Sequence, residues 1–109
     1  MPLELPSPIA AYVEANARLD LDGMMKTFAA DAVLLDNGKR FEGPAEIRAL
    51  LQEMVVDLEA IFTPNTRRHE DDVVVFEGLA NGDFPGSPIR FTYRVELEND
   101  AIKTMDISA

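Results

Sequence analysis

The sequence predicts a single α+β domain in which helices cover one face of a curved, mostly antiparallel sheet. The chain has 109 residues, which is room for one domain, and its 47% of hydrophobic residues can form a core. Local patterns follow the order α-α-β-β-α-β-β-β-β along the chain. Four consecutive strands at the end favour antiparallel pairing, with the helices packed on one side.

Two short helices are predicted before the first strand. Ser7-Pro8 is typical of a helix start, with Ser as the cap and Pro in the first turn. Asp20 is the expected cap of the second helix. The residues at helical spacing in these two segments are Ile9, Tyr12, Val13 and Asn16, followed by Leu21, Met24, Met25 and Phe28.

A hairpin and a third helix follow. The β-type run Val33–Leu35 ends in Asp36-Asn37-Gly38, and Asn-Gly is the strongest short hairpin signal. Lys39–Glu42 is the expected return strand. Pro44 in Gly43-Pro44-Ala45-Glu46 suits a helix start, and apolar residues at helical spacing predict one continuous helix to Leu58.

The second half of the chain predicts four strands. The clearest is Ile89–Leu97, where apolar and polar residues alternate with the period of a half-buried strand. The other three are expected at Glu59–Glu70, Val73–Phe76 and Ile102–Ile107.

Composition excludes several classes of function. The formal net charge is −10, so the chain lacks the cations that bind nucleic-acid phosphates or an anionic membrane surface. Cysteine is absent and His69 is the one histidine, which argues against thiolate and His-rich metal sites. Met1–Pro6 lacks the regions of a signal peptide, and no apolar run reaches the roughly 18 residues of a membrane span. We therefore expect a cytoplasmic protein with no metal, nucleic-acid or membrane partner.

Four stretches of sequence carry a family resemblance. They are Tyr12-Val13, Leu21-Asp22-Gly23, Phe28–Val33 and Phe41–Arg48. With the element order, they resemble the nuclear transport factor 2-like superfamily, and most closely its ketosteroid isomerase and SnoaL-like group. The resemblance implies one domain over residues 1–109, shaped as a cone around an apolar pocket.

The resemblance also implies catalytic positions. Isomerases of this group place a Tyr on the first helix and a carboxylate base at the end of the first strand, which match Tyr12 and Asp36. The family's second oxyanion donor is an Asp on the penultimate strand. Tyr93 occupies the matching position here, or Phe91 or Thr92 if the alignment shifts.

These three residues suit proton transfer next to a carbonyl. An apolar pocket raises the pKa of a carboxylate toward the working range of a base, and a phenol can donate to the oxygen that becomes an enolate. Ketosteroid isomerase itself combines a carboxylate base with hydrogen-bond donors to the enolate oxygen in this way. Each residue also has a purely structural interpretation: Tyr12 and Tyr93 as core residues and Asp36 as a turn residue.

The expected pocket and partner complete the prediction. The outer sheet face, with Thr66, Arg68, Arg90, Thr92 and Arg94, is expected to form a homodimer. The residues expected to bind a small hydrophobic molecule are Phe28, Phe41, Leu51, Met54, Phe62, Phe76, Phe91 and Met105.

The leading hypothesis is a ketosteroid-isomerase-like enzyme that needs no cofactor. It would move a proton alpha to the carbonyl of a small hydrophobic ketone, with Asp36 as base and Tyr12 as oxyanion donor. Two alternatives remain open: a non-catalytic domain of the same superfamily that binds a small molecule or dimerises, and a SnoaL-like polyketide cyclase.

Overall fold

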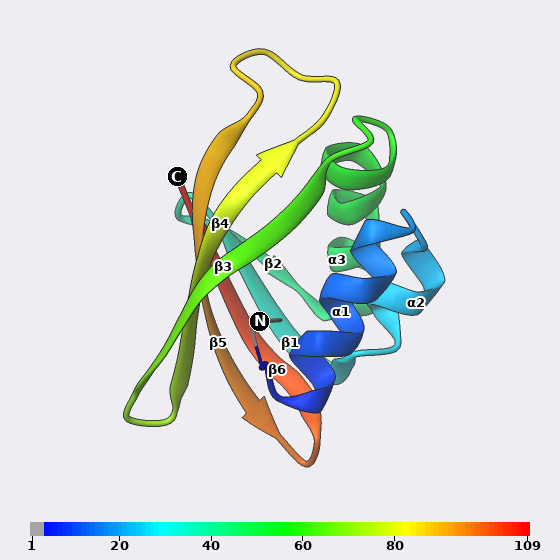
Figure 1. The fold of residues 1–109 in the computed structure, drawn as a ribbon. Helices are drawn as coiled ribbons and strands as arrows, with labels where there is room; N and C mark the ends of the chain where they lie inside the picture. The colour runs from blue at the N-terminus through cyan, green and yellow to red at the C-terminus, as the bar shows by residue number, and fades with distance from the viewer. Residues whose placement is uncertain (1–3) are drawn as a thin grey trace.

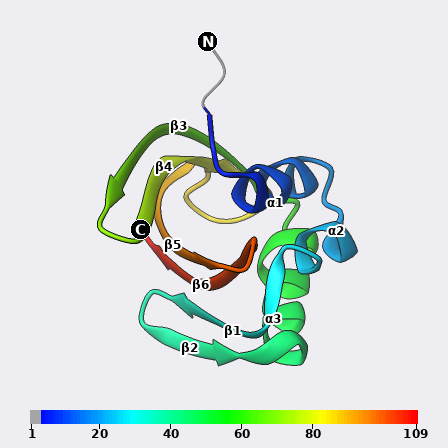
Figure 2. The ribbon, with the colours of Figure 1, turned by 90° about the horizontal axis from the view of Figure 1, so that it is seen from below.

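Six strands form one strongly curved sheet, and the helices pack against its concave side (Figure 1). The computed structural model describes residues 4–109, so the expectation for Met1–Pro6 lies partly outside the described residues. Seen from below, the sheet curves strongly, and the helices lie on its concave side (Figure 2). This arrangement is the predicted α+β cone. No helix among the described residues has the length and apolar character to cross a bilayer.

The helices begin close to their predicted starts. Asp20 caps α2, and its Oδ1 accepts a hydrogen bond from the Gly23 N–H at 3.0 Å. Ser7 was expected to cap α1, but it is the first helical residue, and Pro6 at the cap position lets the chain enter without a side-chain bond. The helical segments are α1 (Ser7–Ala17), α2 (Leu21–Met25), α3 (Gly43–Leu51) and the π-helical turn η1 (Gln52–Val56).

The third helix is not the uniform helix that its apolar spacing predicts. After Leu51 it widens into η1, where the Asp57 N–H donates to the Gln52 carbonyl at 2.9 Å across five residues. A π-helical turn accommodates an extra residue and shifts the side chains that follow it around the helix axis. Residues of this turn, among them Met54 and Val55, line an apolar cavity between the helices and the sheet.

The sheet has the order β2-β1-β6-β5-β4-β3, with β1 and β6 parallel and every other neighbouring pair antiparallel. Asn37-Gly38 forms the predicted turn, with both residues at positive φ. Phe28 was grouped with the second helix but begins the first strand. The strands are β1 (Phe28–Asp36), β2 (Lys39–Glu42), β3 (Ile61–Glu70), β4 (Val73–Asn81), β5 (Ile89–Glu98) and β6 (Ala101–Ser108).

The core lies between the helices and the concave face of the sheet. Alternate residues of β1 point inward, so Ala32 and Leu34 are fully buried and Asp36 follows on the same face. On β5 the same period buries Tyr93 and Val95. Side chains fill one end of this space, while the end near Asp36 remains hollow.

The convex face of the sheet carries ion pairs between strands. Arg94 on β5 contacts Glu70 on β3 at 2.7 Å, and Arg90 on β5 contacts Glu77 on β4 at 3.1 Å. These charges are therefore paired within one chain. The homodimer expected on this face remains a proposal.

Candidate functional site

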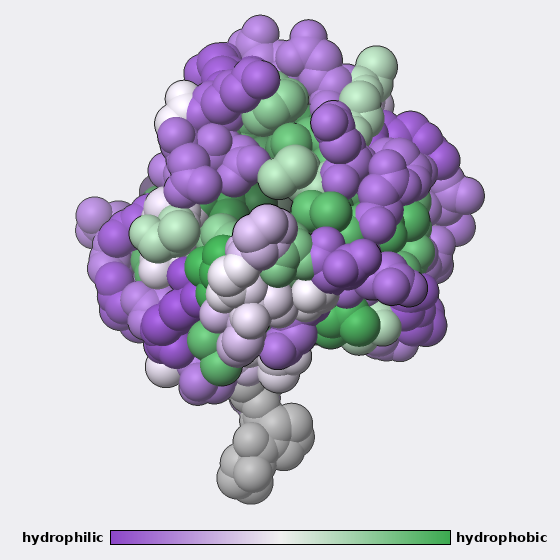
Figure 3. Space-filling model, turned by 90° about the horizontal axis from the view of Figure 1, so that it is seen from above, coloured by the Kyte–Doolittle hydropathy of each residue, from purple (hydrophilic) through white to green (hydrophobic). Residues whose placement is uncertain are grey.

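A cavity of about 210 Å³ opens at the end of the molecule that carries the loop between β4 and β5. Viewed onto this end, apolar residues are visible in a hollow between hydrophilic ones (Figure 3). The polar residues on its wall are Asn16, Asp36 and Tyr93. The apolar lining residues are Leu50, Leu51, Met54, Val55, Leu58, Ala60, Phe62, Ala80, Phe84, Ile89, Phe91 and Ile107.

Asp36 is the one carboxylate among the described residues of the cavity wall. It is the last residue of β1, where the alternation that buries Leu34 points its side chain inward. The following turn is held to β6, because the Asn37 N–H donates to the Ile107 carbonyl at 2.8 Å. Asp36 takes part in none of the ion pairs found within residues 4–109. Burial raises the pKa of this carboxyl above its ordinary value.

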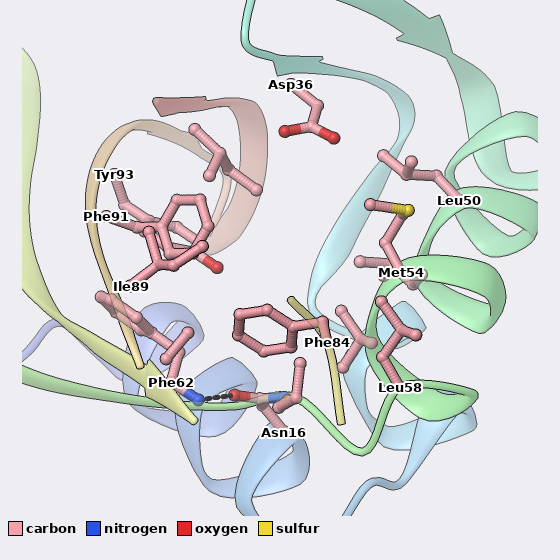
Figure 4. A pocket seen from close by; sticks show the side chains of 15 residues that line it. Asn16, Asp36, Leu50, Met54, Leu58, Phe62, Phe84, Ile89, Phe91 and Tyr93 are labelled. Carbon is pink, nitrogen blue, oxygen red and sulfur yellow. Dashed lines mark hydrogen bonds between the residues drawn. The ribbon is translucent and has the colours of Figure 1, made fainter. Parts of the chain in front are cut away.

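Tyr93 supplies the phenol of the cavity. It projects from β5 and is 7% exposed, and its ring stacks on Phe76 at 5.1 Å and lies 4.3 Å from Phe62 between ring centroids. These contacts fix the ring while its hydroxyl is directed to the interior (Figure 4). Burial foremost, with the nearby Tyr12 and the charge of Asp36, raises the pKa of Tyr93 well above its ordinary value. The phenol therefore remains a hydrogen-bond donor at neutral pH.

Tyr12 is not among the residues that line the cavity. It projects from α1 into the core, where it is 1% exposed and packs edge-on against Phe28 at 5.9 Å. Its hydroxyl lies within hydrogen-bonding reach of the Tyr93 hydroxyl, with the ring centroids 6.5 Å apart. Burial raises the pKa of Tyr12, and the Tyr93 hydroxyl partly offsets that rise. The two phenols are thus neighbours, and Tyr93 is the one on the cavity wall.

Asn16 forms part of the wall near the loop that precedes β3. Its Nδ2 donates to the Ala60 carbonyl at 2.9 Å, and its Oδ1 accepts from the Phe62 N–H at 2.8 Å. The side chain thereby pairs with the backbone at the start of β3 as a neighbouring strand would. This clamp joins α1 to the sheet and holds the amide rigidly, with 3% of the residue exposed.

The structure divides the predicted binding residues into two groups. Leu51, Met54, Phe62 and Phe91 lie on the cavity wall. The other four lie elsewhere: Phe76 and Met105 are deep in the core, Phe28 packs on Tyr12, and Phe41 lines a groove beyond Asp36 between β2 and α3.

Several wall residues were missed by the sequence reasoning although signals for some exist. Ile89 shares the alternation of Phe91 and Tyr93, which places the three on one face of β5. Leu50 and Leu58 belong to the apolar pattern of the third helix. Asn16 is a polar residue on an otherwise apolar helical face, which is a signal for a buried polar role. Phe84, Ala60 and Ala80 depend on how the sheet curves, and local patterns do not report that.

The described part of the chain contains no cluster of side chains suited to binding a metal ion. No three His, Asp or Glu side chains of residues 4–109 come close enough to share a metal ion. Asp36 and Tyr93 are the titratable side chains among the residues that line the cavity.

Comparison with known families identifies the chain. Residues 9–105 match the model of the SnoaL-like domain, which covers most of the sequence. The chain belongs to the SnoaL-like domain family. The superfamily predicted from Tyr12-Val13 and the related stretches is thereby confirmed. A comparison with curated proteins finds no match.

Solved structures show the same SnoaL-like fold. A protein from Sinorhizobium meliloti described as a "putative polyketide cyclase" has a TM-score of 0.88 and 28% identity, with 95% of each chain covered. TerC, co-crystallised with polyporic acid, has a TM-score of 0.79 and 17% identity over 94% of this chain and 88% of its own. A protein from Catenulispora acidiphila with a ketosteroid isomerase-like fold, in complex with trimethylamine, has a TM-score of 0.82 and 17% identity over 97% and 87%.

Proposed function

We propose that this SnoaL-like protein is a cofactor-independent enzyme that enolises a small hydrophobic ketone, as ketosteroid isomerases do. The observation that carries the proposal is the pairing of Asp36 and Tyr93 on one apolar cavity wall. A base and a hydrogen-bond donor are the two groups that removal of a proton next to a carbonyl requires. Burial, which raises the pKa of Asp36, makes its carboxylate a stronger base than a solvated one.

The proposed reaction has two proton transfers. The Asp36 carboxylate takes a proton from the carbon next to the carbonyl, the C–H bond breaks, and its electrons form an enolate. The Tyr93 hydroxyl donates a hydrogen bond to the enolate oxygen. Protonated Asp36 then returns the proton to the γ carbon, which converts a β,γ-unsaturated ketone into its α,β-unsaturated isomer.

Tyr12 takes a different place from the one expected for it. The sequence hypothesis made it the oxyanion donor, but Tyr93 lies on the cavity wall with Tyr12 behind it. We assign Tyr93 the donor role and Tyr12 a positioning role through the neighbouring hydroxyl. The cavity volume of about 210 Å³ is below the roughly 300–1,000 Å³ of common ligand pockets, so a compact ketone suits it better than a large ring system.

A second reaction is favoured by one specific comparison. The Sinorhizobium meliloti protein is similar over nearly the whole chain, and its description names a polyketide cyclase. An aldol ring closure begins with the same enolisation, after which the enolate carbon attacks a second carbonyl of the same molecule. Asp36 and Tyr93 would perform the first step in either reaction.

Isomerisation of a β,γ-unsaturated cyclic ketone tests the proposal, because the conjugated product absorbs in the ultraviolet. We expect Asp36→Asn to lower kcat/KM by about 10²–10⁴-fold, the usual contribution of a general base. Asp106→Asn is the matched control, since Asp106 lies on β6 outside the cavity wall. Absence of isomerisation by the unaltered protein would favour the non-catalytic alternative, and equal rates in the two variants would contradict Asp36 as the base.

A further inference from the structure

We propose that Asn16 binds ligand: one N–H of its side-chain amide donates to a second oxygen of the substrate, away from the carbonyl that accepts from Tyr93. The substrate class is then a compact, neutral carbonyl compound with an additional oxygen acceptor at its other end. The inference rests on the proposed function only for the position of the first carbonyl. The contact with Asn16 is a matter of binding and does not require turnover.

One N–H of the Asn16 side-chain amide is not used in its two hydrogen bonds to the backbone. A primary amide has two N–H groups and one carbonyl oxygen. The carbonyl accepts from the Phe62 N–H, and one N–H donates to the Ala60 carbonyl. These two partners also fix which end of the amide is nitrogen, because the reversed orientation would oppose two donors and two acceptors. The second N–H has no acceptor among residues 4–109.

The remaining N–H belongs to a buried side chain that borders the cavity. Asn16 is 3% exposed and lies on the cavity wall. A buried donor without an acceptor is destabilising, so native proteins supply an acceptor to nearly all of them. The neighbouring wall residues Phe62, Phe84 and Ala60 have apolar side chains, which cannot accept. The Nδ2 atom already has one partner in the Ala60 carbonyl, and the cavity that Asn16 borders is where we expect the acceptor for its second N–H.

The position of Asn16 relative to Asp36 defines the shape of the ligand. The two residues lie at opposite ends of the cavity, and the Tyr93 hydroxyl and apolar side chains lie between them (Figure 4). A ligand whose carbonyl oxygen accepts from the Tyr93 hydroxyl, with the adjacent carbon facing Asp36, extends its other end toward Asn16, where a second oxygen accepts from the amide. The Asp36 carboxylate and the net charge of −10 disfavour an anion, so the second oxygen belongs to a neutral carbonyl, ether or hydroxyl group.

A matched pair of ligands measures this contact. The probes are β-decalone and a decalindione whose second carbonyl is on the far ring, titrated into the protein by calorimetry. We expect the dione to bind about tenfold more tightly, which is the gain from one good hydrogen bond. Met54→Ala is the control: it removes apolar wall without touching the amide and should weaken both ligands by the same factor. Equal affinities of the unaltered protein for the two ligands would overturn the proposal.

A direct reading of the amide avoids any variant that fails to fold. In isotope-labelled protein the two Asn16 amide protons give separate resonances on one nitrogen, assigned by through-bond correlations to the rest of the Asn16 side chain. The dione should move the proton that is not bonded to Ala60 downfield, and the decalone should leave it in place. Identical responses to both ligands would contradict the assignment. Failure of the proposed function would show separately, as a lack of Asp36-dependent isomerisation.

Discussion

The Asp36 carboxylate and the Tyr93 hydroxyl face one apolar cavity from strands β1 and β5, which are separated in the sheet by β6. Side chains alternate between the two faces of each strand. Asp36 is the last inward-facing residue of β1, and Tyr93 is one of the inward-facing residues of β5. Curvature of the sheet then turns both strands toward the same space (Figure 2). A base and a donor on rigid strands are held in place before a ligand binds, which is what enolisation requires.

The two phenols should contribute unequally to the reaction. Tyr93→Phe removes the hydroxyl on the cavity wall and should lower kcat by about 10²–10³-fold, as loss of one oxyanion donor does in other enzymes. Tyr12→Phe removes a hydroxyl that acts through Tyr93, so its effect on kcat should be smaller. Steady-state kinetics of the isomerisation measure both. A larger loss for Tyr12→Phe, with both variants folded by circular dichroism, would reverse the assigned roles.

Asn16 should be important for stability independently of any ligand. Asn16→Ala leaves the Phe62 N–H and the Ala60 carbonyl without their partner at a buried site. We expect a loss of about 2–5 kcal/mol in the free energy of unfolding, measured by urea denaturation. Gln52→Ala is the control, because its hydrogen bond to Asp57 at 2.7 Å is exposed. That change should stay within about 0.5 kcal/mol of the unaltered protein, and a similar loss in both variants would contradict the clamp.

The raised pKa of Asp36 links stability to pH. A carboxyl with a higher pKa in the folded state binds its proton more tightly there than in the unfolded chain. Its stabilising contribution is complete below the unfolded value of about 3.9 and is lost as pH rises through the folded pKa. Asp36→Asn removes this dependence, so the variant should gain stability relative to the unaltered protein as pH increases.

Urea denaturation of both proteins at several values of pH measures that difference. Asp106→Asn removes the same formal charge and accounts for the general effect of a less negative chain. A difference between Asp36→Asn and the unaltered protein that stays constant, or that reverses with pH, would show that burial does not hold the proton on Asp36.

The sequence contains enough local information for the elements but not for the cavity wall. Asn37-Gly38 predicted a turn, Asp20 predicted a helix cap, and the alternation around Tyr93 predicted a strand. Each of these signals acts within a few residues, so it can be recognised in the sequence. The placement of Tyr12 behind Tyr93 depends on how α1 crosses the sheet. Such long-range packing has no local signature, and neither does the widening of the third helix after Leu51.

The proposed base and donor show the same contrast between local signals and long-range packing. The family resemblance pointed to Asp36, and the Asn37-Gly38 turn fixed its place at the end of the first strand. The sequence hypothesis took Tyr12 as the donor from the family resemblance, because both tyrosines show the apolar spacing of core residues and spacing alone does not separate them. Their relative depth is decided by the contacts of Tyr93 with Phe62 and Phe76, three residues on three different strands.

Exchange of the proton next to a ketone carbonyl tests the central claim most directly. Enolisation in heavy water replaces this proton by deuterium, whether the enolate goes on to isomerise or to close a ring, and proton NMR of β-decalone follows the loss. We predict that the protein accelerates exchange, that the rate falls as pH drops below the raised pKa of Asp36, and that Asp36→Asn lowers it by about 10²–10⁴-fold. Exchange at the same rate in the unaltered protein and in Asp36→Asn would contradict the claim that Asp36 is the base.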